Sequence, residues 1–282
     1  MWWKTVVGLL FVSMLVGAFF LRPARDRSGL DGSGKQHEAD RRLRLMTWNI
    51  GHGNLESDTR AHSEDFPAVA ELILRHDPDA VAIQELTGPD QLNRLLGLLQ
   101  DRYHGFAGSN GSSDRVTAVL VRVRPGKNFL PQFASVPAGD KFAAAATFLW
   151  TRELPEIVFI SAHADASKAS RRRTFVSDLI DWKRQKTSGK TMLIAADLNF
   201  EVSTQKQAGL FTDSAKHDSE SYTSLLKHFS DLGRDAGATA VNARRIDYVF
   251  GPLGALATRA EVLRGAAIGR MDHWPLLVEI TF

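Results

Sequence analysis

The sequence contains no cysteine among its 282 residues. Disulfides, thiolate metal sites and a cysteine nucleophile are therefore excluded. Any bound metal must be held by carboxylate, amide or imidazole groups, and an oxygen-rich set of this kind favours hard cations such as Mg²⁺, Mn²⁺ or Ca²⁺. The absence of cysteine suits a reducing and an oxidising compartment equally, so it does not indicate a location.

Residues 43–282 also lack an excess of either charge. The whole chain is basic, with a pI near 9.2. Seven of its 35 Lys/Arg and four of its 32 Asp/Glu lie in residues 1–42, which leaves 28 of each sign in the remainder. A neutral domain argues against strong non-specific binding of duplex nucleic acid. The basic excess instead lies beside the apolar N-terminus, where it would meet lipid headgroups.

Only one long apolar run is present, in residues 6–21 (VVGLLFVSMLVGAFFL). With Trp2 and Trp3 in front of it, the run just reaches the roughly 17–25 residues of a spanning helix, and tryptophans suit the membrane interface. We therefore predict a membrane anchor in residues 1–21. The alternative is a cleaved signal peptide, with Lys4 as its basic region and a weak cleavage site at residues 16–18.

The charges that flank this segment give opposing indications of its orientation in the membrane. Lys4 and the α-amine favour an N-terminus inside the cell, whereas the arginines that follow Leu21 oppose it. We expect residues 43–282 to lie outside the cytoplasm. Residues 22–42 are polar and contain Gly and Ser, which predicts a flexible linker.

Residues 43–282 show no long linker and no internal repeat, which predicts one domain, expected to be a monomer. Apolar runs and periodicity predict strands at 43–50, 79–86, 115–123, 142–150, 157–163, 191–196, 245–250, 259–263 and 276–280, and helices at 64–76, 89–102 and 168–186. Two β-rich halves with covering helices indicate an α/β fold in which two sheets pack inside two helical layers.

Polar residues recur where the predicted buried strands end. They are Asn49, Glu85, His163, Asp197, Asp247 and the pair Asp272–His273. Since strand ends can gather residues from distant parts of a chain at one rim of a sandwich, these side chains are candidates for one site. Each of them alone could be structural: an Asn or Asp at a strand end can satisfy backbone groups. Glu85 is harder to explain in this way, because a lone carboxylate near a core is costly.

Six segments carry a resemblance to a known family. They are TWNI (47–50), IQEL (83–86), SAHAD (161–165), ADLN (196–199), RIDYVF (245–250) and MDHWPL (271–276). Together, and in this order, they resemble the endonuclease/exonuclease/phosphatase superfamily, which contains DNase I-like nucleases, neutral sphingomyelinases and inositol-polyphosphate phosphatases. The resemblance implies a four-layer α/β/β/α sandwich of the DNase I-like type, in agreement with the strand pattern.

The resemblance also implies roles for single residues. Glu85 matches the acidic metal ligand, supported by Asn49, and Asp272 matches an acidic residue that reaches the metal directly or through water. Asp197 and Asn199 match the pair that faces the attacking water and a phosphate oxygen. His273 matches the histidine in the last segment of the family pattern, and Asp247 matches the carboxylate that orients this histidine. His163 matches the histidine of the DNase I and sphingomyelinase branches.

These residue types suit hydrolysis of a phosphate ester. A cation such as Mg²⁺, or Mn²⁺, held by carboxylates would neutralise phosphate charge, and an Asp–His pair fixes the imidazole tautomer and raises its basicity. Asn and His donors can bind oxygens on which charge develops. We therefore predict a metal-dependent phosphoric ester hydrolase with Asp197 or His273 as the base. Its substrate class, whether phospholipid headgroup, nucleic acid or inositol phosphate, stays open.

Three flanking residues depart from the family pattern: Ala196 replaces a frequent Gly, Leu198 a frequent Phe and Met271 a usual Ser. They bear on substrate fit more than on chemistry. Arg172 or Arg173 resembles a family arginine on the following helix, or has a structural role. The alternative function is a non-catalytic, membrane-tethered binding module on the same fold, which predicts erosion of the site residues.

Overall fold

The computed structural model describes residues 42–51, 59–108, 115–124, 130–151, 154–202, 212–265, 268 and 271–282. The predicted anchor or signal segment, and all of the predicted linker except Arg42, lie outside the described residues. Within the described ranges, no helix is both long enough and apolar enough to cross a membrane.

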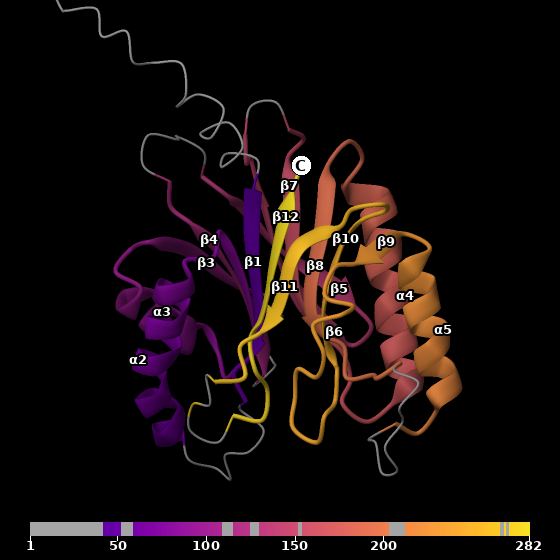
Figure 1. The fold of residues 1–282 in the computed structure, drawn as a ribbon, viewed down its shortest axis with the longest axis horizontal. Helices are drawn as coiled ribbons and strands as arrows, with labels where there is room; N and C mark the ends of the chain where they lie inside the picture. The colour runs from indigo at the N-terminus through magenta and orange to yellow at the C-terminus, as the bar shows by residue number, and fades with distance from the viewer. Residues whose placement is uncertain are drawn as a thin grey trace, which may run out of the picture. The chain divides into compact units, whose positions relative to one another are not determined.

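Twelve strands of the described chain form two six-stranded sheets (Figure 1). The first sheet has the order β11-β12-β1-β2-β4-β3. Its strands are β1 (Arg42–Asn49), β2 (Ala80–Leu86), β3 (Tyr103–Gly108), β4 (Val116–Arg122), β11 (Ala257–Val262) and β12 (Leu276–Thr281). The second sheet has the order β5-β6-β7-β8-β10-β9. Its strands are β5 (Gln132–Ala138), β6 (Lys141–Phe148), β7 (Ile157–His163), β8 (Thr191–Asp197), β9 (Phe229–Asp231) and β10 (Asp247–Pro252).

Helices cover the outer face of each sheet. On the first sheet lie α2 (Thr59–His76) and α3 (Pro89–Leu98), and on the second lie α4 (Ala169–Lys186) and α5 (Ala215–Leu226) (Figure 1). Three apolar clusters separate the four layers: one under α2 and α3, one under α4 and α5, and one between the sheets. The predicted α/β/β/α sandwich is confirmed.

The central strands are apolar on both faces because both faces are covered. In β1, Met46 and Trp48 pack toward the helices, whereas Leu43 and Leu45 pack between the sheets. This double burial explains why the strand is an almost continuous apolar run rather than an alternating one.

The two sheets do not divide the chain into two consecutive halves. The last hairpin of the chain returns to the first sheet, where β12 pairs antiparallel with β1 from Arg42↔Thr281 to Thr47↔Leu276. Apolar patterning shows that a strand exists but does not show which strand it pairs with.

Four elements have no counterpart in the predicted set: β3, β5, β9 and α5. β5 is an edge strand with alternating exposure and contains Pro137, β3 contains two glycines, and β9 has three residues. The sequence of α5, AKHDSESYTSLL, is mostly polar. In each case the sequence signal is weak, and pairing or packing with a neighbour stabilises the element.

One end of the sandwich collects the polar residues. β1 runs parallel to β2, and β7 runs parallel to β8, so the carboxyl ends of each pair lie together. β10 and β12 are antiparallel to their neighbours, so their first residues lie at that same end. Since β2 packs over β7 and β1 over β8, both sheets contribute to a single rim.

Candidate active site

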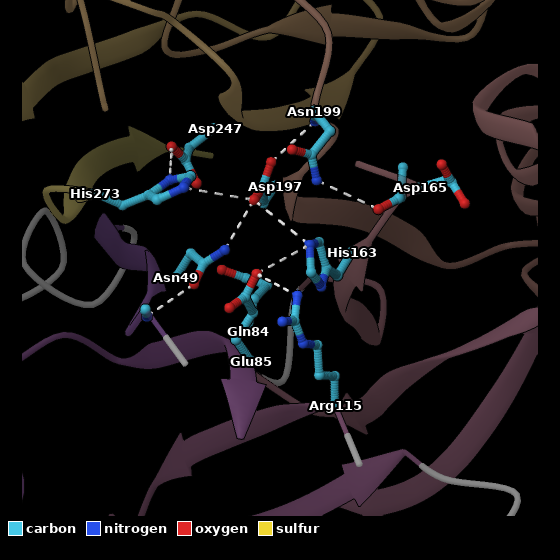
Figure 2. A network of polar contacts seen from close by, with 12 residues as sticks. Asn49, Gln84, Glu85, Arg115, His163, Asp165, Asp197, Asn199, Asp247 and His273 are labelled. Atoms are coloured by element: carbon cyan, nitrogen blue, oxygen red, sulfur yellow. Dashed lines mark hydrogen bonds and ion pairs between the residues drawn. The ribbon is translucent and has the colours of Figure 1, made fainter. Parts of the chain in front are cut away.

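The predicted residues meet at this rim, and Figure 2 labels all of them except Asp272, whose Oδ1 lies 4.0 Å from Nε2 of His273. Asn49 ends β1, His163 ends β7, Asp197 ends β8, and Asp247 begins β10. Glu85 is the last but one residue of β2, Asn199 lies two residues beyond β8, and Asp272 and His273 precede β12. All of them are buried except Asp272, which is partly exposed.

Asp197 is the centre of the network. Its Oδ1 accepts the backbone N–H of Asn199 at 2.9 Å, and its Oδ2 accepts the side-chain amide of Asn49 at 2.8 Å. The same Oδ2 lies 3.6 Å from Nε2 of His163 and 3.8 Å from Nε2 of His273. Three side chains, two from the ends of β1 and β7 and one from the segment before β12, therefore converge on one carboxylate, which is 1% exposed.

Asp247 and His273 form a buried pair in which Nδ1 of the ring lies 2.8 Å from Oδ2 of the carboxylate. The hydroxyl of Thr239 accepts the backbone N–H groups of both Ile246 and Asp247, and the Thr239 carbonyl accepts the N–H of Trp274. Thr239 thus ties the start of β10 to the segment that carries His273, which fixes the pair.

Glu85 is placed by an irregularity in β2. Its φ angle is +63°, in the left-handed region, and the pairing of β2 with β4 shifts between Ile83 and Leu86. Such a conformation costs free energy in a non-glycine residue and is found at functional sites. Glu85 Oε1 lies 3.6 Å from Nε2 of His163 and 3.8 Å from Nη1 of Arg115 (Figure 2).

Gln84 joins the two sheets behind the site. Its side-chain amide donates to Thr47 Oγ1 at 3.2 Å and to Ser161 Oγ at 3.1 Å, and Ser161 donates in turn to the carbonyl of Ile83. All four residues are buried. Buried polar groups are stable only when they are paired. This network therefore fixes the position of β2 on one sheet relative to β7 on the other, and with it the position of Glu85 relative to His163.

The carboxylates and histidines of the site shift one another's pKa values. Burial raises the pKa of Asp197 to about 7; the charge of His273 opposes this rise, and that of Asp247 adds to it. Burial on its own would lower the pKa of His273, but Asp247 and then Asp197 raise it to about 10. The pKa of His163 lies well below its usual value, first because of burial and then because of Lys141 and other nearby cations.

Asp272 lies beside Gly51. A Cβ atom on Gly51 would stand 3.3 Å from Cα of Met271 and 3.6 Å from Oδ1 of Asp272, and the residue has a φ of +67°. Only glycine adopts this conformation without strain. The N–H of Gly51 donates to Oδ1 of Asn49 at 2.9 Å, so the same turn brings Asn49 close to Asp272.

These residues fit a hard divalent cation. Glu85, Asp272 and Asn49 offer carboxylate and amide oxygens, the donor types that Mg²⁺ and Mn²⁺ prefer. In addition, His163 Nε2 and Asp247 Oδ1 are buried without a hydrogen-bond partner among the described residues. Buried polar atoms of this kind, grouped at one site, indicate that a ligand satisfies them. Asp197, Asp247 and His273 also have ligand atoms within 4.8 Å of one another, but Asp247 and His273 already bind each other.

The arginines after the SAHAD segment do not enter the site. Arg172 is fully buried and donates two hydrogen bonds to Asp218 and one each to the Asp165 carbonyl and Thr212. It joins α4 to α5 and therefore has a structural role. Arg171 and Arg173 are exposed and pair with nearby acidic residues.

Two basic residues of the rim were absent from the predicted site. Arg115 precedes β4, and Lys141 is the first residue of β6. Neither belongs to a recognisable segment, and only strand pairing brings them beside His163 and Glu85. Their place at a strand boundary is the one sequence signal that could have found them.

The sequence of residues 46–269 matches the endonuclease/exonuclease/phosphatase family. The chain belongs to this family. Most of the chain, including every residue of the rim except Asp272 and His273, lies within the matched range, and those two residues lie three and four positions beyond its end. Enzymes of this family are typically phosphoester hydrolases and generally depend on a divalent metal. No curated protein has a significantly similar sequence.

Solved structures share the fold of this family member at low sequence identity. An endonuclease/exonuclease/phosphatase family protein from Bacteroides thetaiotaomicron is 17% identical with a TM-score of 0.66, over 86% of this chain and 98% of that one. The mannosyl-6-phosphatase Bt3783 from the same species is also 17% identical with a TM-score of 0.66, over 85% and 100%. The human Nocturnin catalytic domain with a bound sulfate anion is 18% identical with a TM-score of 0.64, over 86% and 94%.

Proposed function

We propose that this chain is a divalent-metal-dependent phosphoesterase that hydrolyses a phosphodiester or phosphomonoester. The observation that carries the proposal is the convergence on Asp197 of Asn49, His163 and His273, with Glu85 beside His163. These residues come from four different strands and one connecting segment, and a set so dispersed in the sequence is assembled only by the fold.

Asn49, Glu85 and Asp272 would hold the cation, Mg²⁺ or alternatively Mn²⁺. When bound, the cation supplies charge neutralisation at the phosphate and at the departing oxygen. The positive charge of Arg115 partly offsets the negative charge of Glu85. The contacts of Arg115 and of His163 are both with Oε1 of Glu85.

Asp197 is placed to accept the proton of the attacking water. Its Oδ2 is the atom on which the other groups converge, and the N–H groups of Asn49 and Asn199 hold the carboxylate in one orientation. The oxygen of the water forms a bond to phosphorus, one proton passes to Asp197, and the ester P–O bond breaks with its electrons on the leaving oxygen. Positioning and electrostatics of this kind supply most of the catalysis in phosphoryl transfer.

The two histidines face the same space from opposite sides of Asp197. His273 is oriented by Asp247 through Nδ1, which leaves Nε2 directed toward Asp197 (Figure 2). In its Nε2–H tautomer, His163 donates to a phosphate oxygen or to the leaving oxygen, which gives a partner to a buried nitrogen that lacks one among the described residues. The amide of Asn199 adds a further donor.

A substrate panel tests the proposal. The full chain is assayed with plasmid DNA, RNA, sphingomyelin, inositol phosphates and bis-p-nitrophenyl phosphate, in Mg²⁺ and in EDTA. We expect hydrolysis of at least one ester that EDTA abolishes, and a loss of about 10²-fold or more in kcat for Asp197→Asn. Activity that persists in EDTA would refute the metal dependence.

pH–rate profiles measured with an active ester from this panel distinguish the two candidate bases. A pH–rate profile of Asp197→Asn and of His273→Ala shows which variant loses the rising limb of the wild-type profile. The non-catalytic alternative, a membrane-tethered binding module, predicts no turnover of any ester in Mg²⁺ or Mn²⁺. The site gives this alternative no support, because all the predicted residues are present and lie together at one rim.

We further propose that the chain is a monomer held at a membrane by residues 1–21, with its catalytic domain outside the cytoplasm. The support is the apolar run with its flanking tryptophans and arginines. A bilayer location brings lipid headgroups within reach of the site, but the chemistry of the rim is common to all phosphate esters.

A further inference from the structure

Lys141 stands at the catalytic rim without a role in the assembly just described. It is the first residue of β6, and β6 runs antiparallel to β7, so its position lies across from the end of β7. Its ammonium group donates to the backbone carbonyl of Ala164 at 2.9 Å. Ala164 directly follows His163, which places the ammonium group next to the site.

Lys141 forms no ion pair with the residues that the structure describes. No carboxylate of the described residues lies within 4.0 Å of its Nζ, whereas Lys190 pairs with Glu156 at 2.8 Å and Lys168 with Asp213 at 3.6 Å. An ammonium group has three N–H donors, and the described residues satisfy one of them. The side chain is half-buried, so the remaining charge is incompletely solvated, which is costly unless an anion neutralises it.

The charge of Lys141 acts on the residues of the site. Burial lowers the pKa of Lys141, and four carboxylates oppose this effect: Asp165, Asp197, Asp140 and Glu85. In turn, Lys141 is the strongest charged influence that lowers the pKa of His163. The ammonium group is therefore within electrostatic reach of both the central carboxylate and the candidate metal ligand.

The shared carbonyl of Ala164 fixes where the ammonium group lies. It accepts a hydrogen bond from Nζ of Lys141 at 2.9 Å and another from Nδ2 of Asn199 at 3.3 Å. The two donors are therefore neighbours on one side of the site. Asn199 is the residue assigned to a phosphate oxygen, so an anion in contact with its amide lies close to the lysine as well.

We propose that Lys141 binds the phosphoryl group of the substrate, donating from Nζ to a non-bridging oxygen beside Asn199 and His163. This inference rests on the proposed function, because it names a further substrate contact of the same site. The phosphoryl oxygen would give Lys141 the close ion pair that the described residues do not provide. With Arg115, Lys141 then adds positive charge to the rim, beside the N–H donor of His163.

Binding of inorganic phosphate by the full chain in EDTA tests the proposal without catalysis. Calorimetry would compare the wild type with Lys141→Met, which keeps the length of the side chain and removes its charge, and with Lys141→Arg. We expect the Kd for phosphate to rise about 10-fold or more in Lys141→Met, in line with the loss of one charged hydrogen bond. Lys141→Arg should recover most of the affinity.

Lys183→Met is the matched control. Lys183 also donates to a single backbone carbonyl, that of His228 at 3.2 Å, and burial also lowers its pKa, but it lies on α4 away from the rim. It should bind phosphate as the wild type does. Equal phosphate affinity in Lys141→Met and Lys183→Met would overturn the proposal, and so would a wild type that binds no phosphate.

A second measurement uses whichever ester the wild type hydrolyses in Mg²⁺. There kcat should fall by about 10²-fold in Lys141→Met, as for the loss of one preorganised donor, and remain unchanged in Lys183→Met. If the wild type hydrolyses no ester, the proposed function fails, while phosphate binding that depends on Lys141 would still uphold the inference. Unchanged kcat and unchanged phosphate affinity in Lys141→Met would overturn it.

Discussion

Three of the polar side chains at the rim have neighbours that restrain them. Asp247 orients His273, Asn49 and Asn199 orient Asp197, and Arg115 stands beside Glu85. Because these groups are buried, their interactions are weakly screened and their protonation states depend on one another. Substituting one residue should therefore change the properties of its neighbour in a measurable way.

The Asp247–His273 pair gives the first prediction at this scale. Asp247 is the largest influence that raises the pKa of His273, which reaches about 10, so the ring keeps its proton at neutral pH. Asp247→Asn removes that negative charge, and the pKa of His273 should fall. NMR titration of the ring nitrogens in EDTA measures this shift directly.

Turnover of the Asp247→Asn variant should also fall, by about 10²-fold or more, because the ring loses its fixed orientation. Asp218→Asn is not a suitable control, since Asp218 anchors Arg172. Asp178→Asn, on the exposed side of α4 where its carboxylate accepts the N–H of Gly139, should leave both measurements unchanged. An unaltered ring titration in Asp247→Asn would contradict the role given to the pair.

Glu85 gives the second prediction. Glu85→Gln keeps the size of the side chain but removes a charged oxygen ligand, so affinity for Mn²⁺ should fall by at least about 10-fold, a loss that even outer partners of metal ligands can produce. Electron paramagnetic resonance of free Mn²⁺ measures this affinity without any substrate. Glu156→Gln, which affects a carboxylate paired with Lys190, is the control and should bind Mn²⁺ as the wild type does.

At the scale of elements, the connections between strands decide whether the rim is assembled. Hydrogen bonds of Gln84 hold β2 against β7, and hydrogen bonds of Thr239 hold the start of β10 beside the segment before β12. Arg172 and Asp218 join α4 to α5 on the outer face. These contacts do not touch a substrate, yet they set the separations on which the chemistry depends.

Thr239→Val tests one of these connections. Valine has nearly the same shape but no hydroxyl, so the buried N–H groups of Ile246 and Asp247 lose their acceptor. Each unsatisfied group costs about 1–3 kcal/mol, so the free energy of unfolding should fall by a few kcal/mol. Chemical denaturation measures the loss.

Because Thr239 positions Asp247, kcat of the Thr239→Val variant should fall while the protein remains folded. Thr117→Val serves as the comparison, since Thr117 is also buried and its hydroxyl accepts the N–H of Ala144. It should lose stability with much less effect on kcat. Equal effects of the two variants on kcat would refute a positioning role for Thr239.

At the scale of the whole molecule, the candidate site at the rim is separate in the sequence from the apolar N-terminus. Deletion of residues 1–21 should therefore release the protein from the membrane fraction while leaving kcat/KM for a soluble ester within about two-fold, because no described site residue belongs to that segment. Cell fractionation with an alkaline carbonate wash, followed by assay, provides both measurements.

Replacing residues 1–21 with an unrelated apolar anchor should return the protein to the membrane. A truncated chain that stays in the membrane pellet would contradict the anchor, and N-terminal sequencing of the mature protein would reveal a cleaved signal peptide instead.

The sequence was sufficient to predict much of the fold and of the candidate site. The strands around Asn49, Glu85, His163 and Asp197 are long apolar runs that end in a polar residue, and such runs are recognisable because they are buried on both faces. It was insufficient for β9 and α5, whose local signals are weak, and for the return of β12 to the first sheet.

The sequence by itself determined the kind of chemistry available: it has no thiol, it supplies carboxylates, amides and histidines at strand ends, and its six ordered segments resemble one family. The tertiary structure alone decided which of these groups meet. It brought Lys141 and Arg115 to the rim, made Arg172 structural and set Asp197 at the centre. The physical reason is that strand pairing and sheet packing join residues far apart in the chain, and contacts of that range leave no periodic signal in the sequence.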